Sequence, residues 1–316
     1  MKFRIKPADT FIWNLSELID FLIQFQKQSI VIENGTEGCC ARTVGLYHWL
    51  DQFEFADVTI LTSNSLERHD RYQVKIKLPW KFLQVAQPID TQWQVWNKRQ
   101  VFGTVYGRPL WHRLGIAAHL LTNHRDISAV GIAVDPADVN QRELFELTQL
   151  WQHSPASLQN FAKIFDQLPL RHADIDTYTP GAHLTDGYVA QTKRIYQHFL
   201  IDVVAETFTS GNCFFVTEKT IRPMLLKKPF IVMGPESYLD YLHQMGFRTF
   251  SDFWDETYDG YQGQERYQRI LALIDDLATK SLDQLEKMYL DMQYTLEHNY
   301  HLLMSQSYKK QIERIS

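Results

Sequence analysis

Apolar positions along this chain recur with two periods, one typical of strands and one typical of helices. The opening segment is polar, and Asn14–Lys27 then carries apolar residues at helical spacing. The β-branched run Ser29–Glu33 predicts a short buried strand, which the glycine-bearing turn Asn34–Gly38 follows. A helix at Ala41–Phe53 and a strand at Asp57–Leu61 come next. The order strand, turn, helix, strand predicts an α/β unit.

A second unit of the same kind begins near residue 100. A strand at Val101–Tyr106 precedes a helix at Trp111–Leu121 and a strand at Val130–Val134. The same two periods predict an edge strand at Tyr72–Leu78, strands at Ile201–Glu206 and Pro229–Met233, and helices over residues 138–165, at Tyr188–His198, at Thr217–Leu226 and along Glu265–Ile315. Strands that alternate with helices favour mostly parallel sheets.

Length and composition fit two domains. The chain has 316 residues, of which 45% are hydrophobic and 22% charged, and this is enough apolar material for two separate cores. We expect an α/β protein of two Rossmann-like domains, residues 1–97 and 98–316, facing each other across a cleft. The C-terminal helices are expected to pack back on them.

Charge and cysteine usage narrow the class of protein. The net charge of −5 argues against a general nucleic-acid coat, although a local basic groove is compatible with it. Cys39, Cys40 and Cys213 do not favour a disulfide framework, and no Cys/His spacing resembles a zinc site. No apolar run approaches the roughly 18–20 residues of a membrane span. We therefore expect a cytoplasmic protein, in the host cytoplasm if it is viral.

The most informative stretch runs from Ile201 to Tyr258. A buried strand ends near Glu206, a polar glycine-bearing loop follows, and Thr217 is a natural N-cap for the next helix. Glu218 and Lys219 stand in its first turn. A helix N-terminus beside a lysine suits a diphosphate, and a carboxylate there can accept bonds from ribose hydroxyls. The same three residues also make good capping chemistry without any ligand.

These residues resemble a known family, the α1,3-fucosyltransferases. That family has a strand ending in Phe-Glu-Asn, a loop, Tyr-(Val/Ile)-Thr-Glu-Lys, a helix, and a strand beginning with Pro. This chain has Ala205-Glu206-Thr207, then Phe215-Val216-Thr217-Glu218-Lys219, then Pro229-Phe230-Ile231-Val232. The resemblance covers about 60 residues and implies a GT-B fold with a nucleotide-sugar site in the C-terminal half. A looser likeness to phage-type relatives spans Gly246–Asp259.

The resemblance also implies roles for particular residues. By their place in the motif, Arg113, Glu218 and Lys219 would hold the diphosphate nucleotide of the donor, and Glu206 matches the earlier glutamate of the family. Thr207 replaces the family's Asn, and the N-terminal half shows no likeness to these enzymes, so the donor base and sugar stay open.

Other candidates come from the residues alone. Arg108 competes with Arg113 for the phosphate role, and Arg222 lies one turn after Thr217 on the predicted helix. Glu37 follows the first strand in a glycine turn, where a carboxylate could act as the catalytic base toward the acceptor hydroxyl.

Three further features receive plainer interpretations. His112 and His119 share a helix with Arg113, and we expect both to be structural. Asp174-Ile175-Asp176 matches an Asp-x-Asp metal-binding motif, but it lies in a predicted loop rich in Pro and His, so no metal ligand is predicted.

The sequence therefore predicts a metal-independent glycosyltransferase without a cofactor. It would move a sugar from a nucleotide-sugar donor to a hydroxyl acceptor, with inversion as the resemblance implies. One alternative is a phage enzyme that glycosylates a hydroxymethylated DNA base. Another is a nucleotide-binding module without catalysis. The acceptor is thus a carbohydrate or modified DNA, no membrane span is expected, and the oligomeric state is open.

Overall fold

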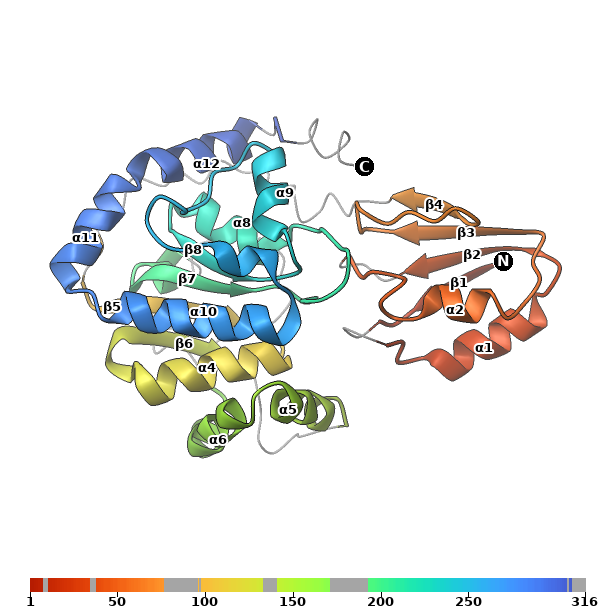
Figure 1. Ribbon diagram of the computed structural model, residues 1–316, viewed down its shortest axis with the longest axis horizontal. Helices are drawn as coiled ribbons and strands as arrows, with labels where there is room; N and C mark the ends of the chain where they lie inside the picture. The colour runs from red at the N-terminus through yellow and green to blue at the C-terminus, as the bar shows by residue number, and fades with distance from the viewer. Residues whose placement is uncertain are drawn as a thin grey trace.

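Two parallel sheets organise the protein in its computed structural model (Figure 1). The structure describes residues 1–7, 11–34, 38–76, 96, 98–132, 141–170, 193–305 and 307–308. Each sheet has four strands, in the order β1-β2-β3-β4 in the first and β6-β5-β7-β8 in the second. Helices accompany both sheets, as parallel strands require for their crossover connections.

The first sheet uses residues near the amino terminus. Its strands are β1 (Lys2–Ile5), β2 (Ser29–Asn34), β3 (Asp57–Thr62) and β4 (Gln73–Ile76), and its helices are α1 (Leu15–Gln24) and α2 (Leu46–Leu50). Helix α1 turns Leu18 and Leu22 inward, one helical turn apart, into a core shared with Ile30 and Ile32 of β2. The alternating burial along β2 matches its predicted period of two.

The second sheet carries the larger core. Its strands are β5 (Gln100–Tyr106), β6 (Ser128–Ile132), β7 (Phe199–Ala205) and β8 (Phe230–Met233). Every residue of β7 is buried, as expected for a central strand covered on both faces.

Helices of this second part follow its strands and then extend along the C-terminal segment. They are α4 (Trp111–Asn123), α5 (Gln141–His153), α6 (Pro155–Ile164), α8 (Glu218–Leu225), α9 (Tyr238–Gln244), α10 (Gly263–Ala278), α11 (Leu282–Asp291) and α12 (Gln293–Ser305). Short 3-10 helices are η1 (Arg125–Ile127), η3 (Phe165–Gln167) and η4 (Thr257–Gly260). In Figure 1, α11 and α12 form an arc around the second sheet. Among the described residues, no helix combines the length and apolar character that crossing a bilayer requires.

The α/β class, the two parallel sheets and the C-terminal helices are confirmed. One element prediction, the helix at Ala41–Phe53, needs correction, and two other segments gain detail. Strand β1 forms within the opening segment, because its backbone pairs with β2 whatever its side chains. The helix predicted at Ala41–Phe53 shrinks to α2, because Gly45 has a left-handed φ of 75° at its start. Residues 138–165 hold two helices, which separate at Ser154, the N-cap of α6.

The two sheets meet through the loops at their carboxyl ends. The loop between β7 and α8 reaches the first sheet, where the backbone N–H of Phe214 donates to Asn64 Oδ1 at 3.0 Å and Phe214 O accepts from Ser65 N at 3.3 Å. From the same loop, Phe208 and Cys213 enter the core of the first sheet. Thus residues 206–217 bridge both parts, and the proposed boundary between residues 97 and 98 stays a prediction.

Candidate functional site

The start of α8 is the centre of the candidate site. Thr217 is extended, with φ −105° and ψ 177°, and its Oγ1 accepts from the backbone N–H of Lys219 at 3.1 Å. The N-cap predicted for Thr217 is therefore confirmed. The helix begins at Glu218, at the carboxyl end of β7, where parallel sheets bind their ligands.

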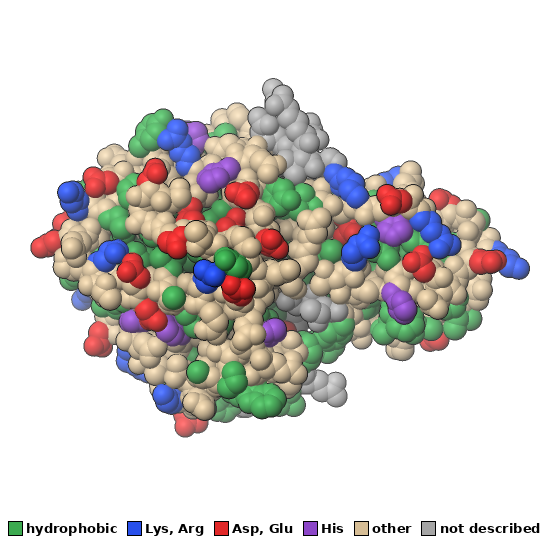
Figure 2. Space-filling view, in the orientation of Figure 1, with side chains coloured by type: hydrophobic (Ala, Val, Ile, Leu, Met, Phe, Trp, Pro, Cys, Tyr) green, Lys and Arg blue, Asp and Glu red, His purple; other side chains and the backbone are tan. Residues whose placement is uncertain are grey.

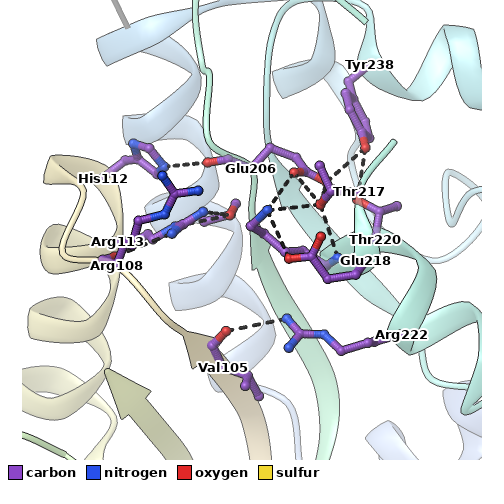
Figure 3. Close-up of polar contacts among 12 residues, drawn as sticks. Val105, Arg108, His112, Arg113, Glu206, Thr217, Glu218, Thr220, Arg222 and Tyr238 are labelled. Atoms are coloured by element: carbon purple, nitrogen blue, oxygen red, sulfur yellow. Dashed lines mark hydrogen bonds and ion pairs between the residues drawn. The ribbon is translucent and has the colours of Figure 1, made fainter. Parts of the chain in front are cut away.

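Glu206 is the hub of the polar contacts around this helix start (Figure 3). Its carboxylate accepts from the hydroxyls of Thr217 at 2.7 Å, Thr220 at 2.8 Å and Tyr238 at 3.1 Å. The residue is only 3% exposed. Because these donors come from α8 and α9, Glu206 fixes the end of β7 to both helices. Glu206 therefore holds the start of α8 in position, and its carboxylate oxygens already accept hydrogen bonds from these hydroxyls.

Lys219 lies between two carboxylates. Its Nζ is 3.5 Å from Glu206 Oε2 and 3.4 Å from Glu218 Oε1, and it donates to Thr217 Oγ1 at 3.1 Å. The ammonium is therefore already paired in this structure. The Glu206 side chain is 4% exposed whereas that of Glu218 is 31% exposed, so Glu218 is the more accessible of the two carboxylates.

Arg113 approaches from the other side of the site, out of the first turn of α4. Its Nε and Nη2 donate to the backbone carbonyl of Ala205 at 3.2 and 2.8 Å, and its Nη1 donates to the carbonyl of Arg108 at 3.4 Å. Only 1% of Arg113 is exposed. A buried guanidinium thus holds together the loop after β5 and the carboxyl end of β7.

His112 is a polar residue of the site that the sequence did not single out for function. Its Nε2 is 2.9 Å from the backbone carbonyl of Glu206. Burial, together with the neighbouring Arg113 cation, holds the pKa of His112 well below its ordinary value. Because a carbonyl only accepts, Nε2 carries the proton and Nδ1 keeps a lone pair. Nδ1 is buried and has no partner among the residues that the structure describes.

Arg222 lies deeper, below the helix start. Its Nη2 donates to the backbone carbonyl of Val105 at 3.4 Å, and its side chain comes from α8 (Figure 3). Arg222 is 4% exposed and faces Asp202 of β7. Burial raises the pKa of Asp202 to about 6, while Arg222 and the Tyr196 hydroxyl oppose that rise. These contacts favour a structural role for Arg222, which connects α8 to β5 and β7.

The structure thus gathers most of the predicted donor-site residues in one region, namely Arg108, Arg113, Glu206, Thr217, Glu218 and Lys219, with Arg222 beneath them. Glu37 and Asp174–Asp176 lie outside the described residues. Thr220 and Tyr238 were missed. The Glu206–Tyr238 contact joins residues 32 apart in the chain, and nothing local marks it.

Gly38 is the first described residue after residues 35–37, and it packs against the loop that leads to α8. Gly38 has φ 75°, and a Cβ added there would lie 2.3 Å from the Cβ of Phe215. Its backbone N–H donates to Ser63 Oγ at 2.7 Å. Since Phe215 stands three residues before Glu218, Gly38 lies near the start of α8.

Comparisons with known proteins give distant structural similarity. An α1,3-fucosyltransferase with GDP matches with 11% identity and a TM-score of 0.37, over 99% of this chain and 90% of that one. A glycosyltransferase from Rickettsia africae ESF-5 gives 10% identity and a TM-score of 0.34, over 96% and 80%. A second α1,3-fucosyltransferase structure gives 12% and 0.35, over 92% and 76%. No family model and no curated protein matches the sequence.

Proposed function

We propose that this protein is a glycosyltransferase that uses a nucleotide-sugar donor and needs no metal for the transfer. The proposal is carried by one observation. An N-capped helix start, with Lys219 in its first turn, faces the Arg113 side of α4 at the carboxyl end of a parallel sheet. Helix N-termini and cations at this edge of a sheet suit a diphosphate.

Because Lys219 is already paired with two carboxylates, a bound donor must displace at least one of them from the ammonium. A diphosphate that took Lys219 as its partner would compete with Glu218, whose side chain is the more exposed of the two carboxylates. We propose that Glu218 turns to the ribose hydroxyls while Glu206 keeps the ammonium in place. Lys219 would then offset the charge that develops on the leaving diphosphate as the sugar–phosphate bond breaks.

Arg113 and Arg108 act differently in this proposal. The Arg113 guanidinium binds backbone carbonyls, so its charge would act on the diphosphate mainly through the low-dielectric interior. Arg108 is half-buried in the loop three residues before α4, and we propose that it contacts a phosphate directly. The acceptor proton would go to Glu37, which directly precedes Gly38 in the sequence, and Gly38 lies against Phe215.

A donor screen tests the proposal. Thermal unfolding of the full chain is followed with GDP-, UDP-, ADP- and CDP-sugars, because a ligand that binds only the folded state raises the melting temperature. The donor that binds is then incubated with oligosaccharide or hydroxymethylated DNA, with and without EDTA. We expect product in the presence of EDTA, with the anomeric configuration of the donor inverted.

The outcomes separate the alternatives. Product only on hydroxymethylated DNA would identify a DNA glycosyltransferase. Stabilisation by a nucleotide sugar without any product or donor hydrolysis would indicate a binding module. No stabilisation by any of the four donor types would reject the proposal.

A further inference from the structure

Three side chains with metal-ligand chemistry meet at the far end of α4. His119 Nε2 lies 2.8 Å from Asp275 Oδ1, and His124 Nε2 lies 2.6 Å from the same oxygen. One ligand atom from each of the three lies within 4.8 Å of the others. His119 belongs to α4, His124 is its C-cap, and Asp275 comes from α10. Figure 2 shows histidine and acidic side chains close together on the surface over α4 and α10.

This cluster is separate from the candidate donor site. His124 lies four residues before β6 begins and its ring is near Phe102, at the amino ends of the strands. His119 follows Arg113 by six residues, which is about 9 Å along a helix axis at about 1.5 Å per residue. The proposed glycosyl transfer uses none of the three.

We propose that His119, His124 and Asp275 form a binding site for a divalent transition metal, for which Zn²⁺ is the best match. Two imidazoles and one carboxylate are a common zinc ligand set, and water fills the fourth position when only three protein ligands are present. Magnesium and calcium prefer oxygen ligands, so the two imidazoles select against them.

The geometry needs only a small opening to admit the ion. In a tetrahedral zinc site with bonds of about 2.0–2.1 Å, neighbouring ligand atoms lie about 3.3 Å apart. The observed nitrogen–oxygen separations of 2.6 and 2.8 Å are shorter by roughly half an ångström. Asp275 can provide this movement, because its side chain is 52% exposed. The imidazoles are more fixed, with side-chain exposures of 9% for His119 and 16% for His124.

A neighbouring side chain supports the His119 ligand. The Asn123 side-chain amide lies 3.1 Å from His119 Nδ1. When Nε2 binds a metal, Nδ1 carries the proton and needs an acceptor. The amide oxygen of Asn123 can provide one, since rotating the amide by half a turn exchanges its oxygen and nitrogen. Such outer contacts set the orientation of a ligating ring.

The bound ion would join α4 to α10. Asp275 is the only one of the three ligands contributed by α10, so the metal would add a cross-link between a helix of the sheet layer and the C-terminal helices. Because binding requires the folded arrangement of both helices, zinc should stabilise the protein.

The test is zinc binding by the metal-stripped full chain, followed by titration calorimetry and thermal unfolding. We expect one Zn²⁺ per chain and a higher melting temperature. His124→Ala and Asp275→Asn should weaken binding at least about 100-fold, and Asn123→Ala about 10–100-fold. Asp275 is exposed and His124 is partly buried, and circular dichroism checks that the variants fold. Absorption by bound Co²⁺ should show tetrahedral coordination in the wild type and not in His124→Ala or Asp275→Asn.

His301→Ala is the matched control. His301 is 73% exposed and lies 3.7 Å from Glu297, but it forms only a single imidazole–carboxylate pair. This variant should bind zinc as the wild type does. Equal zinc affinity in the wild type and in His124→Ala would assign the binding to an adventitious ion elsewhere and overturn the proposal. Lower stability of His124→Ala with no response of the wild type to zinc would overturn it too, since the cluster would then be a hydrogen-bonded triad alone.

Discussion

Replacing Glu206 by alanine removes the carboxylate on which the geometry of the candidate site depends. Three hydroxyls, those of Thr217, Thr220 and Tyr238, donate to it. Lys219 lies 3.5 Å from it. Glu206→Ala therefore leaves buried donors without their acceptor and an ammonium with one carboxylate fewer. We expect both a loss of stability and a displaced start of α8.

The size of the loss follows from which donors can find new partners. Thr220 and Tyr238 are already 3.0 Å apart and can bond to each other. Among the residues that the structure describes, the hydroxyl of Thr217 has no comparable alternative acceptor, and Glu206 beside it is only 3% exposed. Removing one partner from a buried charged network costs about 3–5 kcal/mol, and we expect Glu206→Ala to fall in this range. Glu206→Gln keeps the volume and one acceptor, so about half of that loss is expected.

Urea unfolding followed by circular dichroism measures the free energy of unfolding. Glu236→Ala is the control, because Glu236 is an exposed carboxylate three residues after the neighbouring strand β8, and its removal should change stability by no more than about 0.5 kcal/mol. If Glu206→Ala were as stable as this control to within about 1 kcal/mol, Glu206 would not be the hub that its contacts describe.

Two further predictions concern the contact between the sheets and the buried acid of β7. Gly38 and Gly45 share a φ of 75°, but only Gly38 lies against Phe215. Gly38→Ala should therefore lower the free energy of unfolding in urea by about 1–3 kcal/mol more than Gly45→Ala does. Equal losses of stability in the two variants would contradict the packing. Burial raises the pKa of Asp202 from 3.8 to about 6, so the folded state retains a proton that the unfolded state releases, and stability falls as pH rises from about 4 to about 6. Relative to Asp202→Asn, the wild type should lose up to about 3 kcal/mol over this interval, and parallel pH profiles would contradict the shift.

The sequence predicts those parts of the fold that depend on local signals. The β-branched run of β2 and the N-cap at Thr217 each need only a few neighbouring residues, and both are confirmed. Strand β1 could not be predicted in this way, because each of its residues pairs with a residue of β2 that lies 29 positions further along the chain, as Lys2 does with Val31. A polar segment forms a strand when a neighbouring strand supplies its backbone hydrogen bonds.

In the candidate site, too, the sequence predicts the residues that local signals mark and misses the contacts between distant segments. Lys219 and Glu218 were found because a helix start has a recognisable composition. The position of Arg113 could be predicted but its contact could not, since the guanidinium binds the carbonyl of Ala205, 92 residues away. His112 was interpreted as structural because no pattern around it shows that its ring reaches Glu206 O. Contacts between distant segments decide which polar groups of a site are available to a ligand.

The most direct test of the proposed nucleotide site is titration calorimetry of the full chain with GDP, UDP, ADP and CDP. We expect one of the four to bind and Lys219→Ala to weaken that binding about 10–100-fold, because a charge-assisted hydrogen bond contributes about 1.5–3 kcal/mol. Lys280→Ala, which removes a partly exposed lysine paired with Asp276 of α10, should bind as the wild type does. Equal affinities of Lys219→Ala and the wild type, or no binding of any of the four nucleotides, would contradict the claim that the α8 start holds a diphosphate.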